Sequence, residues 1–276
     1  VGRKYIADLI TGHTSDASYF TVKGINYFPI LHQLVSSELD CDRMDYLLRD
    51  SYFCGVSYGS HDLDWLLDNL EICVENQTAY LGINERAVVT FDDFLLSRYH
   101  MFIMVYFHYR AVCLEQLLYK YFKTSPLEYR IPANIEEYIE HDDQHLMKIL
   151  KRSKNKYAEA IIKNQVPQKI FESFNEGQEK TLNEIQEYLE SEKIEYIRSS
   201  SRGRLSKYYV DETSTSKFPM KVVRKLFNKN ELVMFNINEA TDLFTKFAKS
   251  HAVNRLHCEY DLLSEIQKKQ LDGLIR

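Results

Sequence analysis

The chain has 276 residues, 45% of them hydrophobic, which is enough to bury a large core. Its net charge of -5 excludes an overall basic field that would hold a nucleic-acid backbone non-specifically. The five cysteines include no CxxC pair, which argues against a disulfide framework or zinc ribbon and for reduced thiols in the cytoplasm. No apolar run approaches the roughly 20 residues of a membrane span. We therefore expect a soluble cytoplasmic protein with no membrane partner.

Local patterns predict helices and one hairpin in the first part of the chain. Apolar residues at spacings of three and four predict helices over residues 37–53 and 61–71, with Gly55 and Gly59 between them. Residues 72–83 carry β-branched and aromatic residues on either side of a polar turn, which predicts a short β-hairpin.

A long helix follows the hairpin. Thr90 and Asp93 have the spacing of a capping pair, and the apolar pattern then runs without a break to about Phe122. Pro126 stops it. We expect this to be the central helix of the domain.

The rest of the chain has a different residue pattern. Residues 134–190 predict several amphipathic helices rich in lysine and glutamate. Strands are predicted over 193–211 and 231–237, and helices over 238–249 and 259–273. The fold class expected is mainly α with a C-terminal α+β subdomain.

The predicted helix near residues 36–51, SSELDCDRMDYLLRDS, is unusually charged for its apolar rhythm. On a helical wheel, polar and aromatic side chains fall within an arc of roughly 120°: Asp42, Arg43, Tyr46, Arg49 and Asp50. Met44, Leu47 and Leu48 lie opposite. Taken alone, such a stripe is typical of an exposed helix face, whose ion pairs each contribute only tenths of a kcal/mol.

The wider string LDCDRMDYLLRDSYFCGVSYGSHDLDWLL changes that interpretation. It resembles the segment around the last metal-binding aspartate of the HD-domain phosphohydrolases, in particular the deoxynucleoside triphosphate triphosphohydrolase (dNTPase) branch. The pattern there is D-x-D-[RK]-x-D-Y-x-x-R-D followed by G-[VI]. A second match, R-x7-Y-x-H, falls on Arg98, Tyr106 and His108. The resemblance covers about residues 5–122 well.

The resemblance implies roles for individual residues. Asp42 would complete the metal site, because a hard divalent cation prefers carboxylate oxygen. Arg43 would face the substrate triphosphate, and Arg98 would make a second phosphate contact. Tyr46 would pack against the sugar. The two remaining roles are a hydrogen bond from the sugar 3′-hydroxyl to Asp50 and closure over the sugar by Tyr106.

One part of the family pattern is missing. In the family, the metal ligands follow the order histidine, adjacent His-Asp pair, distant aspartate. Asp42 matches the distant aspartate, and no His-Asp pair precedes it in this sequence. The doublets His61-Asp62 and His141-Asp142 come too late in the chain, and we expect a helix cap from the first and exposed surface from the second. The catalytic histidines are therefore expected upstream of Val1.

The resemblance also implies a domain division and an activity. Residues 1–130 would be the C-terminal part of an HD-type helical catalytic core, and 131–276 a helical, then α+β, subdomain. The activity would be metal-dependent hydrolysis of deoxynucleoside triphosphates (dNTPs) to deoxynucleoside and triphosphate, by a homo-oligomer that an allosteric nucleotide can regulate. Nucleic-acid binding by the basic segments 148–157 and 198–207 is less favoured than a solvated surface.

Two other functions stay open at this point. One is a non-catalytic HD-like module that binds a nucleotide or a partner protein. The other is a different HD phosphohydrolase, for instance one that acts on nucleoside monophosphates.

Overall fold

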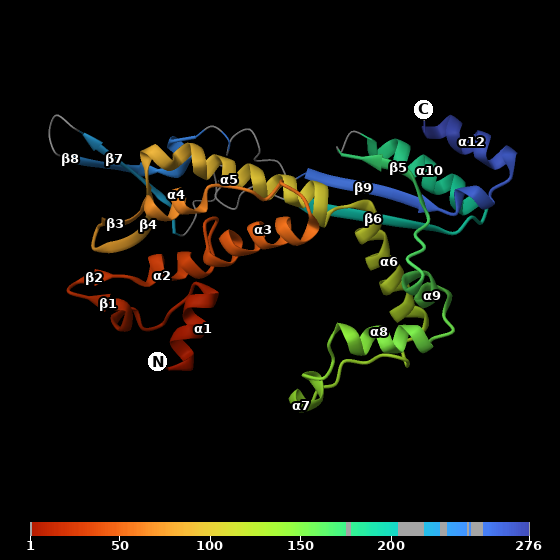
Figure 1. Cartoon of the computed structure of the whole chain (residues 1–276), viewed down its shortest axis with the longest axis horizontal. Helices are drawn as coiled ribbons and strands as arrows, with labels where there is room; N and C mark the ends of the chain where they lie inside the picture. The colour runs from red at the N-terminus through yellow and green to blue at the C-terminus, as the bar shows by residue number, and fades with distance from the viewer. Residues whose placement is uncertain are drawn as a thin grey trace. The chain divides into compact units, whose positions relative to one another are not determined.

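The computed structural model describes residues 2–174, 178–203, 218–226, 231–241, 243 and 251–275 (Figure 1). Within them the chain is mainly α with small β-sheets, so the predicted fold class is confirmed. Two compact units are present: the first contains Val1–Val105 and Arg204–Ser250, and the second contains Tyr106–Gly203 and His251–Arg276. The break therefore falls at 105/106 rather than at 130, and each unit is built from two separate stretches of chain.

The first unit combines helices with a mixed sheet. Its helices are α1 (Arg3–Thr11), α2 (Phe28–Val35), α3 (Cys41–Cys54), α4 (Leu63–Asp68) and α5 (Val88–Met101). Its strands are β1 (Thr21–Val22), β2 (Ile25–Asn26), β3 (Leu70–Glu75), β4 (Thr78–Asn84), β7 (Lys221–Leu226) and β8 (Glu231–Asn236). They are ordered β1-β2-β4-β7-β8, and β3 pairs with β4.

The predicted hairpin is confirmed as β3 and β4. Asn76 and Gln77 both have positive φ, 48° and 58°, which suits the tight turn of a two-residue hairpin loop. Buried Gln33 ties α2 to this sheet, because its Oε1 accepts the Leu81 N–H at 2.8 Å and its Nε2 donates to the Phe218 carbonyl at 3.1 Å.

Helix α3 begins later than the sequence pattern suggested. Asp40 is its N-cap, so residues 37–40 form a capping loop instead of a first helical turn. Gly55 ends the helix at φ 67°, a left-handed conformation that glycine adopts without strain. Gly59 then approaches α3 so closely that a Cβ there would lie 2.3 Å from the Leu47 carbonyl oxygen.

The single long helix predicted to run to Phe122 is wrong. Helix α5 ends at Met101, a π-helical segment follows over Phe102–Tyr106, and α6 (Tyr109–Thr124) starts after His108, whose backbone is extended. Most of the intervening residues are aromatic or β-branched, types that form α-helix less readily. The capping pair is wrong too, because Thr90 lies inside α5.

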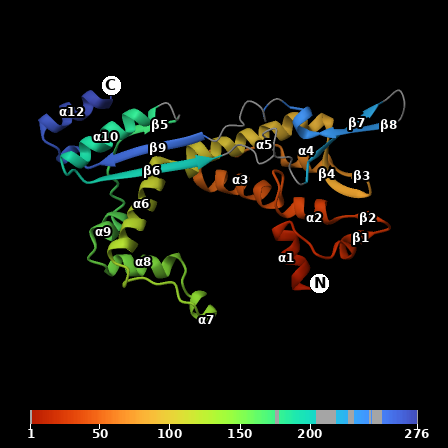
Figure 2. The same ribbon diagram turned by 180° about the vertical axis from the view of Figure 1, so that it is seen from behind.

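The second unit packs helices on both faces of a three-stranded antiparallel sheet. Its strands, in the order β5-β9-β6, are β5 (Gln168–Ser173), β9 (His251–Cys258) and β6 (Tyr196–Gly203). Its helices are α6, α7 (Ile135–Tyr138), α8 (Asp143–Arg152), α9 (Lys156–Ile162), α10 (Glu179–Ser191) and α12 (Glu265–Ile275). Helices α10 and α12 lie on one side of the sheet and α6 on the other (Figure 2).

Several predictions in the second part of the chain need correction. Strand β5 falls within 134–190, where only helices were predicted, and β9 was not predicted. Strands β6 and β8 and the last helix α12 are confirmed in kind. Most of 238–249 and part of the basic segment 198–207 lie outside the described residues. In the described part of the chain, no helix is both long enough and apolar enough to cross a membrane.

Candidate functional site

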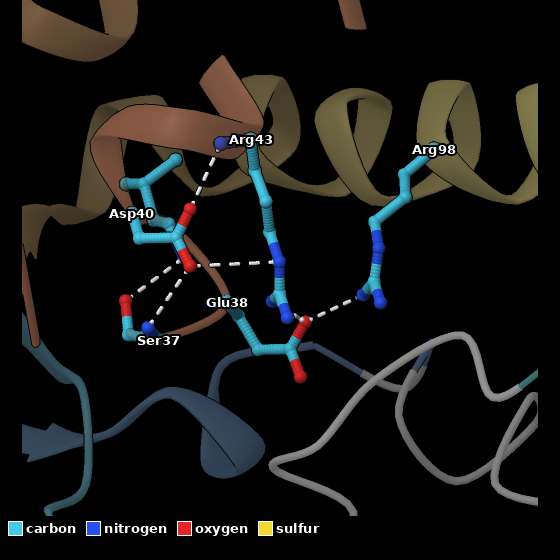
Figure 3. A network of polar contacts seen from close by, with 6 residues as sticks. Ser37, Glu38, Asp40, Arg43 and Arg98 are labelled. Carbon is cyan, nitrogen blue, oxygen red and sulfur yellow. Dashed lines mark hydrogen bonds and ion pairs between the residues drawn. The ribbon is translucent and has the colours of Figure 1, made fainter. Parts of the chain in front are cut away.

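The centre of the candidate site is a buried carboxylate that was not among the predicted residues. Glu38 has 0% exposure, and its Oε2 accepts hydrogen bonds from Nη1 of Arg43 at 3.0 Å and Nη1 of Arg98 at 2.7 Å. Figure 3 shows the two guanidinium groups side by side, pointing from α3 and α5 toward this carboxylate. Two arginines 55 positions apart in the sequence are thus brought to one point.

The loop before α3 fixes the position of Arg43. Asp40 Oδ1 accepts the backbone N–H of Arg43 at 2.8 Å, and its Oδ2 accepts the Ser37 N–H at 3.1 Å (Figure 3). The same Oδ2 lies 3.6 Å from Arg43 Nε. The helix cap therefore also orients the arginine side chain that follows it.

Both guanidinium groups are largely out of water. Arg43 is 8% exposed and Arg98 is 7% exposed, and Arg98 also lies over the Phe102 ring at 5.4 Å. A buried charge is tolerated only when it is paired and hydrogen-bonded, and Glu38 and Asp40 supply that compensation. The result is a pair of preoriented planar cations, the geometry suited to phosphate or carboxylate groups.

The other predicted residues of α3 have different environments. Asp42 is exposed in the first turn, and Tyr46 and Asp50 are half-buried. Arg49 is exposed and pairs with Asp45 at 3.1 Å and with Asp50 at 3.3 Å. The charged arc of the helical wheel is therefore divided: its outer part is a solvated ion-pair surface, whereas Arg43 is buried.

Tyr106 is half-buried at the end of the π-helical segment and is the first residue of the second unit. Its predicted position over a sugar, and the predicted roles of Asp42, Tyr46 and Asp50, stay predictions. Single turns of π-helix inside α-helices occur frequently at functional sites.

The residues of the described ranges do not fit a complete metal site. Those ranges contain no group of three or more His, Cys, Asp or Glu side chains that could hold a metal ion. Asp42 offers one exposed carboxylate. A divalent cation such as Mg²⁺ or Ca²⁺ takes several oxygen ligands, so Asp42 by itself is not a binding site.

Both His-Asp doublets act at helix starts. Asp62 accepts the Trp65 N–H at 3.0 Å and caps α4, as expected, and the adjacent His61 packs edge-on against Phe94, where burial lowers its pKa. Asp142 accepts the backbone N–H of His145 at 2.7 Å and caps α8.

Glu38 could not be found by matching the motif, because it precedes the D-x-D-R string and fell inside a predicted helix. One signal was available. Two arginines assigned to an enclosed site require acidic partners, since buried arginine is nearly always paired. The SSELD segment immediately before the motif contains such residues.

Known proteins resemble this chain over different extents. No family model matches it. Over 117 residues it is 38% identical to an uncharacterized protein of Mycoplasma genitalium, a match that covers 42% of this chain and 25% of that protein. The chain thus aligns with about a quarter of the length of that relative.

Two solved structures are similar over most of the chain. A hypothetical protein from Aquifex aeolicus has a TM-score of 0.72 at 22% identity, covering 98% of this chain and 66% of that one. A phosphohydrolase from Bacteroides thetaiotaomicron has a TM-score of 0.60 at 19% identity, covering 91% and 66%. The chain shares its fold with both.

Proposed function

We propose that this chain is part of a metal-dependent HD-type phosphohydrolase that hydrolyses dNTPs to deoxynucleoside and triphosphate. The observation that carries the proposal is the convergence of Arg43 and Arg98 on Glu38. These two arginines come from separate motifs of the dNTPase resemblance, and both were expected at the phosphates. The fold shared with a phosphohydrolase agrees with the class of reaction.

The chemistry assigned to the chain's own residues is anion binding. Arg43 and Arg98 would hold phosphate oxygens and take up the charge that develops when the phosphoester bond breaks. Glu38 would be a positioning residue, since it fixes both guanidinium planes without touching the substrate. Tyr46 and Asp50 follow Arg43 by three and seven residues on α3, so the three residues share one side of that helix, and the resemblance assigns Tyr46 and Asp50 to the sugar.

Metal dependence enters the proposal from the resemblance alone. Asp42 would contribute one carboxylate, and the histidines that the resemblance implies would have to supply the rest. Homo-oligomerisation and regulation by an allosteric nucleotide are also proposed from the resemblance alone.

The test is an activity assay on the full-length protein with each dNTP and a divalent metal. Triphosphate and inorganic phosphate are quantified separately, because release of phosphate alone would point to a different phosphohydrolase. Arg98→Gln should abolish triphosphate release. The matched control is Arg224→Gln, an exposed arginine of the same unit that pairs with Glu85, and this variant should retain it. Equal activity of the two variants would contradict the proposal.

A second candidate function is a non-catalytic module that binds a nucleotide. It is favoured by the preoriented arginine pair, because two buried guanidinium groups can hold phosphate oxygens without any chemical step. Calorimetry would show dNTP binding that depends on Arg98, and the same protein with metal would release neither triphosphate nor phosphate.

A further inference from the structure

The first unit contains an apolar groove that the proposed reaction does not use. The groove has a volume of about 550 Å³ and lies between α1, residues 19–27 and α2. Apolar and aromatic side chains line it, among them Tyr5, Ile6, Leu9, Tyr19, Val22 and Leu31. Ile6 is 50% exposed and Val22 is 57% exposed. Exposed apolar surface of this kind marks a site that another protein segment covers.

Contacts between aromatic side chains fix the walls of the groove. The rings of Tyr5 and Tyr19 stack with their centroids 3.5 Å apart, and Phe20 packs edge-on against Tyr5 at 5.8 Å. The Tyr5 hydroxyl donates a hydrogen bond to Asp16 Oδ2 at 2.9 Å. Because these contacts order the walls before any segment binds, the entropic cost of binding is reduced.

Helix α7 and its neighbours form an exposed apolar face in the second unit. All residues from 133 to 140 are exposed, and α7 has no buried residue. Tyr138 and Ile139 follow Ile135 by three and four residues, so the three side chains share one side of this helical turn. They are 52%, 68% and 64% exposed, respectively. Apolar residues at this spacing are the anchors by which a helical segment fills a groove.

The charges around the two surfaces are complementary. Residues 131–147 contain no lysine or arginine and five carboxylates: Glu136, Glu137, Glu140, Asp142 and Asp143. Residues 1–31, which form the groove, contain three exposed basic side chains: Arg3, Lys4 and Lys23. The acidic residues there, Asp8 and Asp16, already accept hydrogen bonds from hydroxyl groups of the same segment. This distribution favours contact of α7 with the groove and disfavours contact of α7 with another α7.

We propose that α7 of one copy of this chain docks in the groove of a second copy. Both surfaces are exposed within a single chain, so a second chain can supply the partner of each. The apolar side of α7 fills the groove, and the carboxylates beside it face Arg3, Lys4 and Lys23. Groove and helix are different surfaces, so the contact is heterologous. It includes neither Arg43 nor Arg98, and its test is therefore independent of the hydrolase proposal.

The test measures self-association of the full-length protein by analytical ultracentrifugation at micromolar concentrations. Ile6→Glu places a charge in the groove and Ile139→Glu places one on α7, and each should weaken self-association by about tenfold or more. The matched controls are Val89→Glu in the first unit and Leu262→Glu in the second, which should associate as the parent does. All four side chains are at least half exposed, so all four variants are expected to fold.

A mixing experiment identifies which surfaces meet. The Ile6→Glu variant keeps an intact α7 and the Ile139→Glu variant keeps an intact groove, so a mixture of the two should form a heterodimer although neither associates alone. Reversing two charges beside the groove, in the double variant Lys4→Glu and Lys23→Glu, should also weaken self-association. A parent protein that stays monomeric, single variants that associate as the parent does, or a mixture that forms no heterodimer would each overturn the proposal.

Discussion

The contacts of Glu38 lead to a specific expectation for the stability of the first unit. Replacing Glu38 with alanine leaves the buried guanidinium groups of Arg43 and Arg98 without their shared acceptor. Removing one partner from a buried ion pair costs about 3–5 kcal/mol, much of it the penalty of burying an uncompensated charge. Two charge-assisted hydrogen bonds at about 1.5–3 kcal/mol each give a similar loss, about 3–6 kcal/mol.

The magnitude depends on the chemistry of the replacement. Glu38→Gln keeps the shape and one carbonyl acceptor but removes the negative charge, so its effect should be smaller than that of Glu38→Ala. The assay is urea unfolding followed by circular dichroism, in which a loss of this size shifts the midpoint by at least ~1 M at slopes of about 1–3 kcal/mol/M. Glutamine more destabilising than alanine would contradict the order.

A matched control breaks an ion pair of the same chemistry at the surface. Glu85 pairs with Arg224, and both side chains are at least 40% exposed. Glu85→Ala should leave the midpoint nearly unchanged, because exposed pairs contribute little. If Glu38→Ala unfolds at the same urea concentration as Glu85→Ala, the buried network does not stabilise the fold and the reasoning is refuted.

Three further expectations concern other parts of the chain. Gly59→Ala should destabilise the first unit by about 1–3 kcal/mol, as overpacking does, because its Cβ would lie 2.3 Å from the Leu47 carbonyl oxygen; an unchanged melting temperature would contradict this. Asp62→Ala should cost ~1 kcal/mol by removing the N-cap of α4, measured as a lower melting temperature. Because burial and Arg255 lower the pKa of His257 to about 4 from 6.5, the unfolded chain binds the extra proton first, so stability should fall as pH drops from about 6.5 to 4. Urea unfolding at pH 7 and pH 5 should show a smaller loss in the His257→Gln variant than in the parent.

The elements that were predicted correctly are those whose interacting residues are close together in the sequence. The hairpin of β3 and β4 closes through the two-residue turn at Asn76 and Gln77, so its partners are adjacent in the chain. Strand β5 was missed because its partner is β9, and Gln168 pairs with Cys258, ninety positions later. The prediction of one long helix was wrong for a local reason. The apolar periodicity continues past Met101, but the aromatic-rich segment there adopts a π-helix and ends α5.

The same distinction applies to the candidate site. The motif predicted Arg43 and Arg98, but it does not include their shared partner Glu38, which lies just before α3 and meets Arg98 of α5 through tertiary packing. Periodicity also placed Arg43 on a solvated face, because a helical wheel carries no information about where the rest of the unit lies. The capping role of Asp40 was also missed, because the predicted helix began at residue 37 and so placed Asp40 inside it.

The energetics of the arginine pair bear on which of the two candidate functions is correct. Well-packed apolar residues often stabilise a core as well as a buried ion network does, so the network is weak evidence for a purely structural role. If the arginines serve only the fold, Glu38→Gln should lower stability and leave affinity for tripolyphosphate unchanged. If they bind phosphates, the altered guanidinium orientation should also weaken tripolyphosphate binding under conditions where the variant is fully folded. Affinity equal to that of the parent would leave Glu38 a stabilising residue and remove the observation on which the hydrolase proposal depends.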